Sequence, residues 1–135
     1  MPRVIFVSTA LLVLGALAML VPSDDSHAAD KPAQVLRHVV LYKFKDDLKP
    51  QQVQEVVDTF AALPKKVDTI IGFEHGLNVS QEGKSDGLTH AFVVTFRNEQ
   101  DLKKYLDHPA HLDYVNVVKS RREKVVVFDY WVDAK

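Results

Sequence analysis

The segment YLDHPAHLDY, residues 105–114, gathers side chains that can transfer protons. It holds two histidines, His108 and His111, with a proline between them and a tyrosine at each end. Histidine changes its charge near neutral pH and can act as a general acid or base, while a tyrosine hydroxyl can donate a proton or orient a neighbouring imidazole. The segment is therefore a candidate site for proton transfer.

His111 has the position that a general base needs. Pro109 favours the first position of a helix, which would put His111 at the third. The positive end of the helix dipole then disfavours a positive charge on the imidazole, so the ring can accept a proton near pH 7. Tyr105, one turn earlier, could orient it or polarise a carbonyl group. The alternative is that both side chains only pack at a helix junction, with the histidine bonded to backbone.

Metal and cofactor sites have weaker support in the sequence. His108 and His111 supply at most two ligands, whereas a zinc site takes at least three from the protein. The chain contains no cysteine, which excludes thiol nucleophiles, disulfides and zinc–thiolate sites. No glycine-rich phosphate loop or dinucleotide fingerprint occurs in it. We therefore expect neither a metal nor a cofactor.

The elements that must position these residues follow from the spacing of apolar side chains. Residues 37–45, 70–80, 88–97 and 123–132 are rich in β-branched and aromatic residues and predict four strands. Helical spacing runs from Pro50 to Pro64 and again from Asn98 to residue 118, interrupted at Pro109. This order predicts an α+β fold in which helices cover one face of a four-stranded, largely antiparallel sheet.

The predicted strands are apolar on both faces. In the first strand Val40 and Tyr42 face one way, whereas Val39 and Leu41 face the other. Two helices can cover only one face, and burying a few hundred Å² of the other at ~25 cal/mol per Å² would contribute several kcal/mol. We therefore expect a second copy of the chain to cover it in a homodimer. The alternative is a monomer with a tolerated apolar patch.

The first 28 residues have the order of a secretory signal peptide: Arg3, an uncharged run over residues 4–21, then a polar stretch that ends in small residues. We expect cleavage between Ala28 and Ala29, a linker over 29–35 and a folded domain over 36–133. The protein would then be secreted or periplasmic, without stable membrane association. An uncleaved membrane anchor is the alternative, because the apolar run is long for a signal.

The net charge of the chain argues against a nucleic-acid partner. The formal net charge of the chain is −1. Nucleic-acid binding needs an excess of basic residues, so we expect no nucleic-acid partner.

Five segments of the chain resemble the stress-responsive α/β-barrel family, the Dabb domain: RHVVLYKFKDD, FEHGLNVS, THAFVVTF, YLDHPAH and VVVFDYW. The resemblance runs from about residue 36 to 132, and the HPAH segment with its preceding tyrosine is the most specific element. It implies a ferredoxin-like βαββαβ fold whose homodimer forms an α/β barrel. Most family members have no assigned reaction. One plant member cyclises a linear polyketide by an aldol-type condensation.

The resemblance to that cyclase implies roles for particular residues. It puts an acid–base pair at Tyr105 and His111. It implies a ligand pocket with six residues in or near its wall: His38, Val40, Tyr42, Phe60, Phe92 and His90. This chain departs from the cyclase at Tyr42 and Phe92, which replace smaller aliphatic residues and predict a partly filled cavity. Arg122 stands where the cyclase has a tryptophan.

Two functions remain open at this stage. The first is an exported homodimer that binds a small apolar or aromatic compound without assured catalysis. The second is an acid–base enzyme, a polyketide-cyclase-like aldol cyclase, an isomerase or a lyase, that uses His111 and Tyr105. A haem- or metal-dependent oxygenase has the least support. Solid packing beneath Phe92 and Tyr42 would exclude the enzyme, whereas an open cavity at Tyr105 and His111 would favour it.

Overall fold

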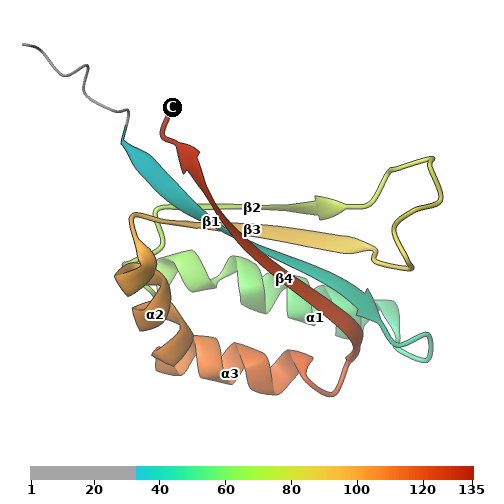
Figure 1. Ribbon diagram of the computed structural model, residues 1–135. Helices are drawn as coiled ribbons and strands as arrows, with labels where there is room; N and C mark the ends of the chain where they lie inside the picture. Colours follow the sequence, from blue (N-terminus) through green and yellow to red (C-terminus); the bar gives the residue numbers. More distant parts are fainter. Residues whose placement is uncertain (1–32) are drawn as a thin grey trace, which may run out of the picture. The chain divides into compact units, whose positions relative to one another are not determined.

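The computed structural model describes residues 33–135; the predicted signal peptide, residues 1–28, lies outside them. The four strands form one antiparallel sheet in the order β2-β3-β1-β4. Helices lie against one face of this sheet (Figure 1). The predicted ferredoxin-like βαββαβ fold is therefore confirmed. The elements in chain order are β1 (Gln34–Phe44), α1 (Pro50–Ala61), the short 3₁₀ helix η1 (Leu63–Lys65), β2 (Gly72–Leu77), β3 (His90–Phe96), α2 (Glu99–Asp107), α3 (Pro109–Val118) and β4 (Arg122–Asp133).

The second helical segment is broken where the sequence predicts it. His108 has an extended backbone, with φ −70° and ψ 135°, because the ring of the following proline disfavours helical backbone in the preceding residue. The Nδ1 atom of His108 accepts a hydrogen bond of 3.1 Å from the backbone N–H of Ala110 and so caps α3. No helix in the described part of the chain is long and apolar enough to span a membrane.

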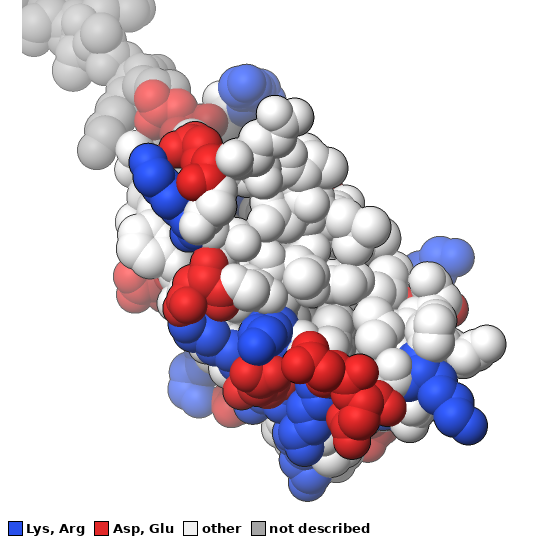
Figure 2. Space-filling view, turned by 90° about the vertical axis from the view of Figure 1, so that its right-hand side faces the viewer, with Lys and Arg blue, Asp and Glu red and all other residues white. Residues whose placement is uncertain are grey.

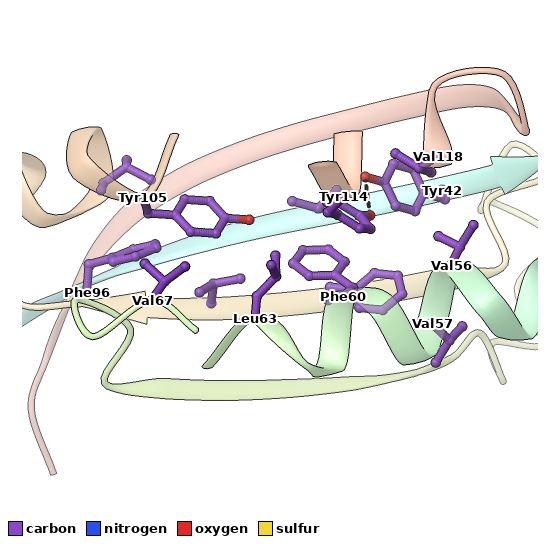
Figure 3. Packing of buried hydrophobic residues seen from close by; sticks show 14 of the residues in the cluster. Tyr42, Val56, Val57, Phe60, Leu63, Val67, Phe96, Tyr105, Tyr114 and Val118 are labelled. Atoms are coloured by element: carbon purple, nitrogen blue, oxygen red, sulfur yellow. Dashed lines mark hydrogen bonds between the residues drawn. The ribbon is translucent and has the colours of Figure 1, made fainter. Parts of the chain in front are cut away.

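The core lies between the sheet and the helices (Figure 3). Alternate residues of β1, from Leu36 to Phe44, face the helices and are buried. Phe60 of α1 stacks on Phe92 of β3 with 4.4 Å between the ring centroids, and both side chains are buried. α1 therefore packs against the β3 side of the sheet. Tyr105 of α2 contacts Phe96 of β3 and His38 of β1, and Tyr114 of α3 contacts Tyr42 of β1.

β4 forms an edge of the sheet and is apolar on both sides. On its outer side Phe128 is 64% exposed and Tyr130 is 42% exposed. In the register of the sheet Phe128 lies opposite Val39, so apolar side chains of two strands adjoin on the face away from the helices. Figure 2 shows a broad uncharged area beside a band of charged side chains on one side of the molecule. The single chain thus leaves apolar surface in contact with water.

Candidate active site

A cavity of about 280 Å³ lies between the β1–β4 half of the sheet and helices α2 and α3. It is partly open to solvent, because β4 is at the edge of the sheet and Val127 on its inner side is 53% exposed. Its wall combines apolar and proton-transferring side chains: His38, Val40, Tyr42, Phe60, Tyr105, Leu106, His111, Tyr114, Val115, Arg122, Val125, Val127 and Asp129.

Tyr105 and His111 meet at this cavity across the junction of α2 and α3. Their ring centroids are 4.4 Å apart. The Nδ1 atom of His111 lies 3.0 Å from the carbonyl oxygen of Leu106. A carbonyl oxygen can only accept, so Nδ1 carries the proton and Nε2 of the neutral ring keeps its lone pair. The turn at His108 therefore fixes both the position and the tautomer of His111.

Burial keeps His111 neutral. It lowers the pKa of the imidazole below its ordinary value, and the hydrogen bond to Leu106 opposes this shift only in part. The nearby His38 and His108 also lower it. A neutral imidazole with a free Nε2 can accept a proton, which is the requirement for a general base.

Tyr105 supplies a hydroxyl next to this base. Burial raises its pKa well above the ordinary value, so the phenol stays protonated and can donate a hydrogen bond. Within residues 33–135 no protein group accepts a hydrogen bond from it. In Figure 3 the hydroxyl points along the helix–sheet layer toward Tyr114 and Tyr42. It is thus available to a ligand oxygen in the cavity.

His38 forms a second polar pair on the sheet side of the cavity. Its Nδ1 atom lies 2.7 Å from Oδ1 of Asp129, its neighbour across the β1–β4 pair. The His38 ring meets the Tyr105 ring edge-on at 5.9 Å between centroids. The carboxylate therefore orients an imidazole that is itself buried beside Tyr105.

Two further phenols lie at the other end of the cavity. The Tyr114 hydroxyl donates a 2.8 Å hydrogen bond to the Tyr42 hydroxyl (Figure 3). Burial raises the pKa of both groups, and for Tyr42 the Tyr114 hydroxyl and the Arg122 guanidinium offset part of the shift. Tyr42 lines this end of the cavity.

The structure brings together six of the eight residues that the sequence singled out. Tyr105, His111, His38, Val40, Tyr42 and Phe60 all line the cavity. Two residues do not line it. Phe92 is fully buried in the core against Phe60, and His90 turns toward Phe44 and the hydroxyl of Thr89 at the end of β3.

Sequence reasoning missed three polar residues of the cavity as site candidates: Tyr114, Asp129 and Arg122. Tyr114 shares a helical face with His111, so spacing alone could have found it. Asp129 interrupts the apolar run VVVFDYWV, which is a signal for a functional carboxylate. Arg122 follows another arginine in a connector, and nothing in the local pattern distinguishes the two.

Metal ligands do not gather in the part of the chain that the structure describes: no group of three or more His, Asp or Glu side chains there could hold an ion. His108 is engaged as the cap of α3, so it does not pair with His111.

The strand order and the cavity define a ferredoxin-like protein with a cavity between its sheet and its helices. The chain belongs to the Dabb family, the stress-responsive A/B barrel domain, whose sequence model matches residues 36–132. It is 33% identical over 95 residues to the stress-response A/B barrel domain-containing protein HS1 of Arabidopsis thaliana, covering 70% of this chain and 87% of that protein. It is also 33% identical over 95 residues to olivetolic acid cyclase of Cannabis sativa, covering 70% of this chain and 94% of that one.

Solved structures share the fold. A hydroxynitrile lyase from Passiflora edulis superposes with a TM-score of 0.71 at 24% identity, over 77% of this chain and 98% of that chain. A dimeric ferredoxin-like protein from Bacteroides fragilis superposes with a TM-score of 0.58 at 29% identity, over 71% and 94% of the two chains. Relatives of this chain are therefore dimeric.

Proposed function

We propose that the protein binds a small apolar or aromatic carbonyl compound in this cavity and transfers a proton at the carbon next to the carbonyl group. One observation carries the proposal: the free Nε2 of a neutral His111 and the protonated hydroxyl of Tyr105 adjoin on an open cavity. The name of the relative from Cannabis sativa, a cyclase, supports a reaction of this kind.

The proposed step uses the two groups in complementary roles. Nε2 of His111 takes the proton, the C–H bond breaks, and its electron pair moves onto the carbonyl oxygen as an enolate. The hydroxyl of Tyr105 donates a hydrogen bond to that oxygen, where negative charge develops in the transition state. His38, held by Asp129, lies behind Tyr105 and adds a second proton-carrying ring. The enolate can then serve an aldol, isomerase or lyase reaction.

Deuterium exchange tests this step without knowledge of the natural substrate. The purified protein is mixed with 4-acetylbenzamide in D₂O, and loss of the acetyl methyl proton signal is followed by NMR. We expect exchange above the buffer rate, and a loss of about 10²-fold or more in His111→Gln, since general bases contribute 10²–10⁴-fold. The control is His75→Gln, because His75 is exposed on β2 and outside the cavity.

The second candidate function is binding without turnover. It is favoured by the apolar part of the wall, which surrounds the polar groups on both sheet and helices: Val40, Phe60, Leu106, Val115, Val125 and Val127. Shifts of the NMR signals of cavity residues by the ketone, with exchange at the buffer rate, would support this candidate and overturn the enzymatic one. If the ketone causes no NMR shifts and no exchange above the buffer rate, both candidate functions are overturned.

A homodimer formed through the outer face of the sheet completes the proposal. The apolar residues of this face, Phe128 among them, are the evidence from this chain, and the dimeric relatives support it.

We also propose that the protein is exported, because residues 1–28 have the order of a secretory signal. Mass spectrometry of protein purified from its source tests export: a chain that begins at Ala29 is expected, and an intact amino terminus would contradict cleavage.

A further inference from the structure

The polar groups of the cavity are arranged in a row along β1. His38 and Tyr42 lie on the same face of the strand, four residues apart. At ~3.3 Å per residue this separation is about 13 Å. Arg122 faces Phe44, two residues beyond Tyr42, in the register of β1 and β4. The imidazoles and Arg122 therefore stand at opposite ends of the cavity.

A β-bulge directs Arg122 into the cavity. The register pairs Lys43 with Lys124 but then shifts, so that Phe44 lies opposite Arg122 and Glu123 is skipped. Glu123 instead accepts a 2.7 Å hydrogen bond from Lys43, whose side chain is on the outer face. Without the bulge the inner position opposite Phe44 would belong to Glu123, because side chains alternate along a strand.

Arg122 has no carboxylate partner among the described residues, unlike three basic residues near it. Among the described residues Arg121 pairs with Glu55 at 2.6 Å, Lys43 pairs with Glu123 at 2.7 Å and Lys124 pairs with Asp86. No carboxylate within the described chain lies within ion-pair distance of Arg122, although its side chain is half-buried. An unpaired, partly desolvated cation is costly, and an anionic ligand would offset that cost.

The Tyr42 hydroxyl adds a neutral donor at the same end. It accepts its hydrogen bond from Tyr114, so its own hydrogen remains to be donated to another acceptor. The Arg122 guanidinium is close enough to lower the pKa of Tyr42 against the effect of burial. A guanidinium beside a hydroxyl donor is a suitable pair for the two oxygens of a carboxylate.

We propose that Arg122 and the Tyr42 hydroxyl form an anion subsite, and that the ligand is an apolar or aromatic oxo acid. Its carboxylate binds at this subsite, and its carbonyl group lies at Tyr105 and His111 on the far side of the cavity. This proposal rests on the proposed function, and it further specifies that the ligand carries a negative charge. The apolar walls at Val40 and Val125 between the two ends accommodate the carbon skeleton.

A pair of probes that differ only in charge tests the subsite. The ligands are 4-acetylbenzoate and its neutral analogue 4-acetylbenzamide, and their affinities are measured by NMR titration or calorimetry on the folded protein. We expect the wild-type protein to bind the acid at least about tenfold more tightly than the amide, which corresponds to about 1.4 kcal/mol. Arg122→Gln should abolish this preference, so that the acid and the amide bind the variant with equal affinity.

The matched control is Arg121→Gln, which removes the same charge one residue away. Arg121 pairs with Glu55 and with the carbonyl of Gln52, so its loss should leave the preference for the acid intact. Circular dichroism and thermal melts verify that each variant is folded. If the Arg122→Gln variant does not fold, the Arg122→Lys variant is used in its place. We expect its preference for the acid over the amide to be smaller than that of the wild-type protein.

The outcomes separate the subsite from the function on which it rests. Equal affinity of the wild-type protein for acid and amide would overturn the anion subsite and leave the carbonyl site intact. A preference for the acid that survives Arg122→Gln would overturn the role of Arg122. Binding of neither probe would overturn the subsite together with the proposed function.

Discussion

At His111, burial and a backbone carbonyl act on the imidazole in opposite directions. Burial is the larger effect, so the pKa lies below the ordinary value of 6.5 while Nδ1 remains bonded to Leu106. The proposed reaction should therefore lose rate only in acid, at a pH below 6.5, as Nε2 takes up a proton. NMR titration of the His111 ring checks this pKa. A value above 6.5 would contradict the assigned environment.

The lowered pKa of His111 also makes the stability of the protein depend on pH. As the pH falls below about 6.5, the unfolded chain binds a proton on this histidine before the folded chain does, so the free energy of unfolding decreases. Above that pH the contribution of His111 is fully present. We expect His111→Gln to reduce this dependence between pH 6.5 and the folded pKa, measured by urea denaturation at several pH values. An unchanged pH dependence would argue that the folded-state pKa is not shifted.

The hydroxyl of Tyr105 has the proposed chemical role, whereas its ring has a packing role. Its ring packs against Phe96 and His38, whereas its hydroxyl has no acceptor in the described chain. Tyr105→Phe should therefore change the free energy of unfolding by less than ~1 kcal/mol. It should lower deuterium exchange about 10²-fold, since removal of one donor to a developing oxyanion costs 10²–10³-fold. Tyr130→Phe, on the outer face of β4, is the control and should keep full exchange. Full exchange in Tyr105→Phe would exclude the hydroxyl as donor.

At the scale of elements, the junction of α2 and α3 positions the proposed base, His111. His108 caps α3 through Nδ1, and the cap holds the helix start that carries His111. His108→Ala should destabilise the protein by about 1 kcal/mol, whereas His108→Asn should retain most of the stability because asparagine is a strong cap. Chemical denaturation of the three proteins measures the difference. Equal stability of the alanine and asparagine variants would show that the cap contributes nothing.

The order of strands and helices could be predicted from local signals. Proline at positions 50 and 109 begins helices, Asn98 caps α2, and the apolar periodicity separates strands from helices. The proximity of Tyr105 and His111 could be predicted from the sequence, because the two residues lie on adjoining turns of one segment. Asp129 interrupts an apolar run, but its partner His38 becomes evident only from the pairing of β1 with β4. Arg122 could not be predicted, because its position depends on a shift in that pairing. His90 was expected in or near the pocket wall, but it pairs with Tyr42 and its ring contacts Phe44, outside the lining of the cavity.

At the scale of the whole molecule, the outer face of the sheet is the proposed dimer interface. Val39 of β1 and Phe128 of β4 adjoin there, and Phe128 is 64% exposed in the single chain. Phe128→Lys should convert the proposed dimer to a monomer at micromolar concentration, because it places a charge in an apolar contact. Analytical ultracentrifugation measures the mass. Leu112→Lys is the control: Leu112 is 50% exposed on α3, away from this face, and its variant should remain dimeric. A wild-type monomer would refute the assembly.

The β-bulge between Lys43 and Phe44 gives the ligand site an unusual sensitivity to insertions and deletions. Loss of Arg122 by deletion would not leave an empty position: the strand would close up by one residue and bring Glu123 to the place opposite Phe44. The cavity would then end in a carboxylate and would suit amines in place of acids. A deletion of three nucleotides would thus reverse the charge of the ligand that the proposed subsite accepts.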